Sequence, residues 1–111
     1  VLFVGDIRHS RVAHSHMELL PRLGAEVGVA GPAELTAQVA GPVAQFENLP
    51  EALAWADVVV GLRVQFERHE NGHSFSRDQF ISRYQIRKEH DRLFKKDALL
   101  FHPGPVNWGV E

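Results

Sequence analysis

The fold is decided by the first residues of the chain, Val1-Leu2-Phe3-Val4-Gly5-Asp6-Ile7-Arg8-His9-Ser10-Arg11-Val12-Ala13-His14-Ser15. An apolar run meets a glycine and an aspartate, and the chain then turns through basic and hydroxyl residues into a helical pattern. In an open α/β sheet, ligands bind outside the carboxyl end of such a strand. The following helix offers unpaired N–H groups and a positive dipole end to an anion. Arg8 and Arg11 add two forks shaped for carboxylate or phosphate. The stretch therefore predicts an anion-binding strand–turn–helix.

Composition predicts one globular domain and excludes several classes of protein. The chain has 111 residues, of which 44% are hydrophobic, and a formal net charge of −2, which gives no reason to expect nucleic acid. It has no cysteine, so a disulfide framework and thiolate chemistry are excluded and a reducing cytoplasm fits. No apolar run is long enough to span a membrane, and no signal peptide is visible. Because the chain begins directly in a strand-like run, we expect a piece of a longer protein.

Apolar periodicity predicts alternating strands and helices. Strands are expected over 1–4, 27–30, 43–46, 57–62 and 98–101. Helices are expected over 10–23, 34–40, 48–56, 76–83 and 87–95, with a polar loop over 63–75. Pro21 should end the first helix early, and Gly24 suits its C-terminus. Asn48 with Glu51, and Ser76 with Gln79, form capping-box patterns. The alternation predicts a doubly wound, Rossmann-like α/β domain with a parallel sheet of about five strands and flanking helices.

Chemistry is expected where three of these strands end, since those ends meet at one edge of a parallel sheet. The first strand leads to Arg8 and Arg11, the fourth to Arg63 and Gln65, and the fifth to Pro103-Gly104-Pro105. Two arginine forks can each hold one carboxylate, and a Pro-Gly-Pro turn offers backbone carbonyls to an amine. The pattern predicts a site for an amino acid with a second acid group. Alternatively, each arginine is an ordinary surface charge and the turn is only a rigid exit from the sheet.

Other polar residues are expected to be structural. Asp6 should bond backbone N–H groups of the turn that contains it. The segment 69–73 reads His-Glu-Asn-Gly-His and matches the zinc-protease pattern H-E-x-x-H. Its central Asn-Gly favours a turn over the helix that zinc chemistry needs, so we interpret it as a polar loop without metal. His14 and His16 are interpreted as helix surface.

Three segments resemble the catalytic chain of aspartate carbamoyltransferases, a family within the aspartate/ornithine carbamoyltransferases. They are residues 5–15 (GDIRHSRVAHS), 62–68 (LRVQFER) and 102–107 (HPGPVN). Residues 20–27 and 52–59 are similar to bacterial members, so the resemblance covers nearly the whole chain in order. It corresponds to the second, aspartate-binding domain of that enzyme. The carbamoyl phosphate domain and the C-terminal helices of the family are absent from residues 1–111.

The resemblance implies transfer of a carbamoyl group from carbamoyl phosphate to the amino group of L-aspartate, a step of pyrimidine biosynthesis. Arg11 and Arg63 would bind the aspartate carboxylates, Gln65 would assist, and Gly104 and Pro105 would contact the carbamoyl group and the amine. The family uses no cofactor, metal or covalent nucleophile, and it forms cytoplasmic homotrimers of the full-length chain, with a dihydroorotase or regulatory chain as further possible partners. Neither nucleic acid nor membrane is implied.

One position departs from the family pattern. Trp108 stands where bacterial members usually have arginine, which leaves a rival interpretation open: a non-catalytic homologue, or an excised folding or assembly module. A further alternative is an ornithine enzyme. The arginine-rich turn argues against it, because the side chain of ornithine carries an amine.

Overall fold

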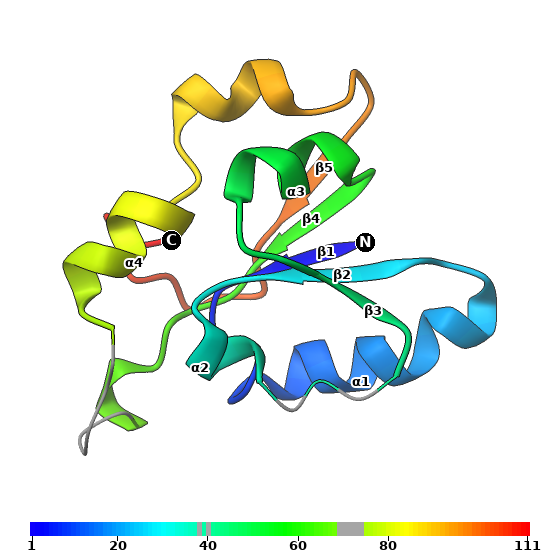
Figure 1. The fold of residues 1–111 in the computed structure, drawn as a ribbon, viewed down its shortest axis with the longest axis horizontal. Coiled ribbons are helices and arrows are strands. Elements are labelled where there is room, and N and C mark those ends of the chain that lie inside the picture. Colours follow the sequence, from blue (N-terminus) through cyan, green and yellow to red (C-terminus); the bar gives the residue numbers. More distant parts are fainter. Residues whose placement is uncertain (38, 40, 69–74) are drawn as a thin grey trace.

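The computed structural model describes residues 1–37, 39, 41–68 and 75–111. These residues form a sheet of five parallel strands in the order β3-β2-β1-β4-β5 (Figure 1). The strands are β1 (Leu2–Val4), β2 (Val27–Ala30), β3 (Val43–Phe46), β4 (Val58–Gly61) and β5 (Leu99–Phe101). All five lie within the predicted ranges, and the predicted doubly wound α/β fold is confirmed.

The connections are helical, as predicted, but several are shorter than the apolar periodicity suggested. The α-helices are α1 (Arg11–Leu19), α2 (Ala33–Thr36), α3 (Leu49–Trp55) and α4 (Arg77–Tyr84), and the 3-10 helices are η1 (Pro21–Leu23), η2 (Phe66–Arg68) and η3 (Lys88–Leu93). Helix α1 stops before Pro21, and Gly24 closes η1 with φ 84°. Asn48 accepts a hydrogen bond from the Glu51 N–H, and Ser76 and Gln79 form the complete capping box of α4.

The structure refines two predictions between residues 63 and 95. In the described part of the expected loop, Phe66–Arg68 form the 3-10 turn η2, and the short helix expected over 87–95 is the 3-10 helix η3. No residue of η3 is buried, so it lacks the apolar stripe that stabilises an α-helix through packing. Backbone bonds from His90 to Arg87 and from Phe94 to Asp91 span three residues instead of four.

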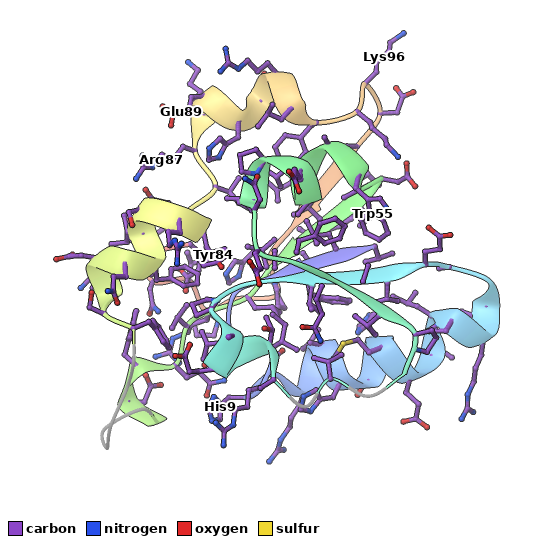
Figure 2. All side chains as sticks on the ribbon, in the orientation of Figure 1. His9, Trp55, Tyr84, Arg87, Glu89 and Lys96 are labelled. Carbon is purple, nitrogen blue, oxygen red and sulfur yellow. The ribbon has the colours of Figure 1, made fainter. Side chains whose placement is uncertain are left out.

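The two faces of the sheet carry separate apolar clusters. One face of the sheet packs against α3, where Leu53 joins Leu2, Val4 and Val59. Phe3 belongs to the cluster on the other face, which α1 covers. This is the alternation expected of a strand buried on both sides. Figure 1 shows α1 and α3 on opposite sides of the sheet, and Figure 2 shows Trp55 at the end of α3, over the sheet.

The edge strand β5 is less well covered than the rest of the sheet. The exposed fractions of Leu99, Leu100 and Phe101 are 53%, 56% and 53%. Register pairs Phe101 with Val60, and Val60 with Phe3, so Leu99 and Phe101 face the α1 side. Among the described residues, no helix is long and apolar enough to cross a membrane.

Candidate functional site

The chain changes direction across the sheet between β1 and β4. It runs outward from β1 through β2 to β3, then returns to pair β4 with the other side of β1. Ligands of open α/β sheets bind at such a switch point, outside the carboxyl ends of the strands. A hollow of about 290 Å³ lies there. Its lining residues are His9, Ser10, Arg11, Val12, Leu62, Arg63, Gln65, Pro103, Gly104 and Pro105. The structure thus brings together all five predicted substrate-binding residues.

The turn after β1 is fixed by a close approach and a buried carboxylate. Gly5 has φ 123°, and a Cβ at this position would meet the carbonyl oxygen of Leu62, so only glycine fits. Asp6 is fully buried. Its carboxylate accepts hydrogen bonds from the His9 N–H (3.2 Å) and the Gln65 N–H (3.1 Å), and His9 Nδ1 lies 2.9 Å away. Asp6 therefore joins the end of β1 to the end of β4, which confirms its predicted structural part in the turn.

The first wall of the hollow is the start of α1. Ser10 caps this helix by accepting the Ala13 N–H at 3.1 Å, and the N–H groups of a first helical turn have no acceptor within the helix. Arg11 is the first residue of α1, is exposed and lines the hollow. Arg8 is also exposed but is not among the lining residues. The geometry therefore separates the two arginines of the opening stretch.

The second wall is the segment after β4. The Arg63 side chain is 32% exposed, pairs through Nη1 with Glu67 at 2.8 Å, and donates from Nε to Asn107 Oδ1 at 3.2 Å. Gln65 Nε2 donates to the carbonyl of His9 at 3.0 Å. Both side chains line the same hollow, as their spacing of two residues predicts.

The third wall is the turn after β5, in which the Gly104–Pro105 peptide is cis and Gly104 has φ 68°. His102 Nδ1 accepts the Gly104 N–H at 2.9 Å. A neutral imidazole has one acceptor and one donor nitrogen, so the ring proton is on Nε2. That nitrogen is buried, and none of the described residues offers it a partner. A Cβ at Gly61 would lie 3.1 Å from His102 Cδ2, so the glycine makes room for this ring.

Two residues that shape the site, Asn107 and Glu111, were not predicted from the sequence as site residues. Asn107 and Glu111 reach back to the segment after β4 over more than forty residues, with bonds from the Asn107 amide to Val64 O (2.8 Å) and from the Val64 N–H to Glu111 Oε1 (3.0 Å). Pairings of this kind follow neither helical nor strand periodicity. The nearest signal is the position of Asn107 just after the Pro-Gly-Pro turn.

The remaining sequence predictions have simpler outcomes. The His-Glu-Asn-Gly-His segment, 69–73, lies outside the described residues, and the described residues contain no cluster of His, Asp or Glu that could hold a metal. His16 Nδ1 lies 2.7 Å from the carbonyl of Val12, and His14 is exposed, so both belong to the helix surface as expected. Trp108 is 88% exposed.

A larger hollow of about 700 Å³ lies between α4 and the ends of β2 and β3. Tyr84, which Figure 2 shows between α4 and the sheet, donates to the carbonyl of Glu47 at 3.4 Å. Burial raises the pKa of the Tyr84 hydroxyl above its usual value of 10, so it remains a donor. Thr36 donates to the carbonyl of Pro32 at 3.3 Å. Both buried hydroxyls of this hollow are bonded to backbone, and none of the five predicted substrate-binding residues lines it, so the smaller hollow is the better candidate site.

Comparison with known proteins gives one family. The family model described as aspartate/ornithine carbamoyltransferase, Asp/Orn binding domain, matches residues 1–111. The aspartate carbamoyltransferase catalytic subunit of Koribacter versatilis (strain Ellin345) is 47% identical over 115 residues, covering 100% of this chain and 38% of that protein. The corresponding subunit of Streptococcus pneumoniae (strain ATCC BAA-334 / TIGR4) is 44% identical over 112 residues, covering 100% and 36%. The chain thus spans 36–38% of the length of these curated relatives.

Solved structures share the fold. Aspartate transcarbamoylase from Trypanosoma cruzi in complex with carbamoyl phosphate matches with a TM-score of 0.79 and 22% identity, over 99% of this chain and 39% of that one. The same enzyme in complex with N-(phosphonacetyl)-L-aspartic acid gives a TM-score of 0.69, over 98% and 38%. At this level of identity the likeness extends to the fold alone.

Proposed function

Because the chain belongs to the aspartate/ornithine carbamoyltransferase family as its Asp/Orn binding domain, we propose that it is the L-aspartate-binding half of an aspartate carbamoyltransferase. The observation that carries the proposal is the hollow at the switch point, lined by two arginines and a proline–glycine turn. In this assignment Arg11 and Arg63 each bind one carboxylate of L-aspartate. Charge-assisted arginine–carboxylate bonds are strong and directional, which suits a dicarboxylate.

The amino group of aspartate belongs beside the third wall. Backbone carbonyls of the turn accept hydrogen bonds from the amine, Gly104 and Pro105 contact the carbamoyl group, and Gln65 assists the binding. The amine nitrogen then attacks the carbonyl carbon of carbamoyl phosphate, the bond to the bridging phosphate oxygen breaks, phosphate leaves, and the amine loses a proton. The residues of this chain contribute by positioning the amine and by stabilising developing charge.

The second substrate belongs to a part of the protein outside residues 1–111. We propose that carbamoyl phosphate is bound by the remainder of a longer polypeptide that functions as a homotrimer, as the resemblance implies. The 111-residue chain alone should therefore show no carbamoyl transfer, whereas the longer polypeptide should convert L-aspartate and carbamoyl phosphate. Measuring carbamoyl aspartate formation by both proteins tests this prediction. Turnover by the 111-residue chain alone contradicts the proposal that carbamoyl phosphate is bound outside residues 1–111.

One observation favours a second candidate, a non-catalytic homologue that serves assembly or folding. Trp108 is 88% exposed, at a position where the family resemblance implies an arginine. Comparing the longer polypeptide with its Trp108→Arg variant separates the two: an inactive parent that gains activity with arginine supports the non-catalytic candidate. Assaying ornithine in place of aspartate tests the remaining alternative, an ornithine carbamoyltransferase. Two arginine forks should reject a side-chain ammonium, so turnover of ornithine contradicts the assignment of both arginines.

A further inference from the structure

The segment that carries Arg63 has no strand partner. The ladder between β1 and β4 ends with the bond from the Leu62 N–H to the carbonyl of Val4 at 2.8 Å, and the next residues leave the sheet. On the β1 side, Asp6 accepts the Gln65 N–H. On the other side, the Val64 N–H and carbonyl bond to Glu111 and Asn107 at 3.0 and 2.8 Å. Two side chains from the C-terminal segment thus replace the missing strand.

Asn107 also touches the guanidinium itself. Its Oδ1 accepts from Arg63 Nε at 3.2 Å while its Nδ2 donates to the carbonyl of Val64. One amide therefore fixes both the side chain of Arg63 and the backbone of the following residue. Glu67 pairs with Nη1 at 2.8 Å, and in the proposed function Nη2 is the nitrogen that meets the ligand carboxylate.

Asn107 is in turn held by Glu111. The Glu111 carboxylate accepts the Asn107 N–H through Oε2 at 2.9 Å and the Val64 N–H through Oε1. The Glu111 carbonyl accepts the Ile86 N–H at 2.8 Å, and Val110 is 1% exposed within the core. In Figure 1 the C-terminus lies beside α4. A continuous chain of contacts therefore links the core to Glu111, Glu111 to Asn107, and Asn107 to Arg63.

From these contacts we infer that Asn107 and Glu111 are positioning residues for Arg63, and that they set the affinity of the site for the carboxylate of its substrate. This inference rests on the proposed function of the hollow. An arginine side chain has many rotamers, and a bond at Nε restricts them before a ligand arrives. Without Asn107 the fork is free to leave the orientation in which Nη2 meets the ligand.

The test uses the longer polypeptide and three variants. Asn107→Ala removes both amide contacts and should raise KM for L-aspartate by about tenfold or more, with KM for carbamoyl phosphate unchanged. Asn107→Asp retains an acceptor for Arg63 Nε but loses the donor to the Val64 carbonyl, so its KM for L-aspartate should lie between those of the parent and of Asn107→Ala. Gln85→Ala is the matched control, because Gln85 Nε2 donates to the Gly109 carbonyl at 2.8 Å in the same segment without touching Arg63. Circular dichroism melting confirms that each variant is folded.

A binding measurement separates this inference from the proposed function. Succinate is a dicarboxylate without an amine, so it can bind to the arginines but cannot accept a carbamoyl group. Isothermal titration calorimetry with succinate, in the presence and absence of carbamoyl phosphate, therefore measures dicarboxylate affinity independently of transfer. Weaker succinate binding by Asn107→Ala than by Gln85→Ala supports the inference even if the parent transfers no carbamoyl group. Normal transfer with equal aspartate KM in the two variants overturns the inference and leaves the function standing. A parent that neither transfers nor binds succinate overturns both.

Discussion

At the scale of single residues, Arg63 is the side chain on which recognition of a dicarboxylate depends most. Replacing Arg63 with alanine leaves a bound carboxylate without its cation, which typically costs about 2–5 kcal/mol when the pair is shielded from water. We therefore expect kcat/KM for L-aspartate in the longer polypeptide to fall by about thirtyfold or more. Steady-state kinetics measures it, and a change smaller than about tenfold counts against the assigned role.

Arg8 provides the matched control for the same experiment. It follows the same strand as Arg11 and is exposed, but it does not line the hollow. Arg11→Ala should resemble Arg63→Ala, whereas Arg8→Ala should leave kcat/KM within about twofold, as is usual for a surface substitution. Equal losses from Arg8→Ala and Arg11→Ala are the result that contradicts the geometric separation of the two arginines.

His102 allows a second residue-scale prediction, because its two nitrogens have different environments. An asparagine side chain places its oxygen near the position of Nδ1, where the Gly104 N–H is bonded, and a glutamine reaches the position of Nε2. His102→Asn should therefore keep the turn and most of the activity of the longer polypeptide. His102→Gln leaves the Gly104 N–H to solvent, and because this bond is exposed we expect a loss of about 0.5–1.5 kcal/mol in the free energy of unfolding. Urea unfolding measures the free energy of unfolding of both variants. If His102→Gln is more stable than His102→Asn, the role assigned to Nδ1 is contradicted.

At the scale of elements, the capping box of α4 can be tested by itself. Ser76 accepts the Gln79 N–H at 3.2 Å, and the Gln79 side chain accepts the Ser76 N–H at 2.7 Å. Ser76→Ala should lower the free energy of unfolding by about 1 kcal/mol, the usual cost of a lost N-cap. Ser82→Ala is the control, since Ser82 lies in the same helix and bonds only to the Gln79 carbonyl. If thermal melting shows the same loss of stability for Ser76→Ala and Ser82→Ala, the capping box does not stabilise α4.

Elements with local signals could be predicted from the sequence. Short apolar runs marked the strands, Pro21 marked the end of α1, and the Ser76 and Gln79 pair marked the start of α4. Local patterns did not distinguish the 3-10 helix η3 from an α-helix, because that choice depends on how much of the segment is buried. The boundaries of several helices differ from the predicted ones by a few residues, because helix ends fray and local sequence patterns do not fix the terminal residue.

The candidate site was predictable only in part. Strand ends identified Arg11, Arg63 and Gln65 as neighbours, because parallel topology brings such ends together whatever their separation in the chain. The contacts of Asn107 and Glu111 with the Arg63 segment depend on the path of the C-terminal turn in three dimensions. No periodicity encodes that path, so these partners emerged only from the structure.

At the scale of the whole molecule, the sheet is well covered near β1 and poorly covered at β5. The strands β1 and β2 are buried throughout. At the edge, Leu99 and Phe101 are each 53% exposed on the α1 side. An exposed, apolar edge strand is a site of association, because its unpaired backbone groups and side chains can meet those of another chain.

We therefore expect the 111-residue chain to self-associate through β5. Sedimentation velocity should show the mean mass rising with protein concentration, and the double variant Leu99→Lys/Phe101→Lys should remain monomeric, because lysine on an edge strand opposes pairing. Leu23→Lys is the control, since Leu23 is 71% exposed on η1, apart from the edge. A wild-type chain that is monomeric at every concentration, or a Leu23→Lys chain that dissociates as completely as the double variant, contradicts the assignment. Far-ultraviolet circular dichroism of all three proteins ensures that a difference in mass reflects the edge and not a loss of fold.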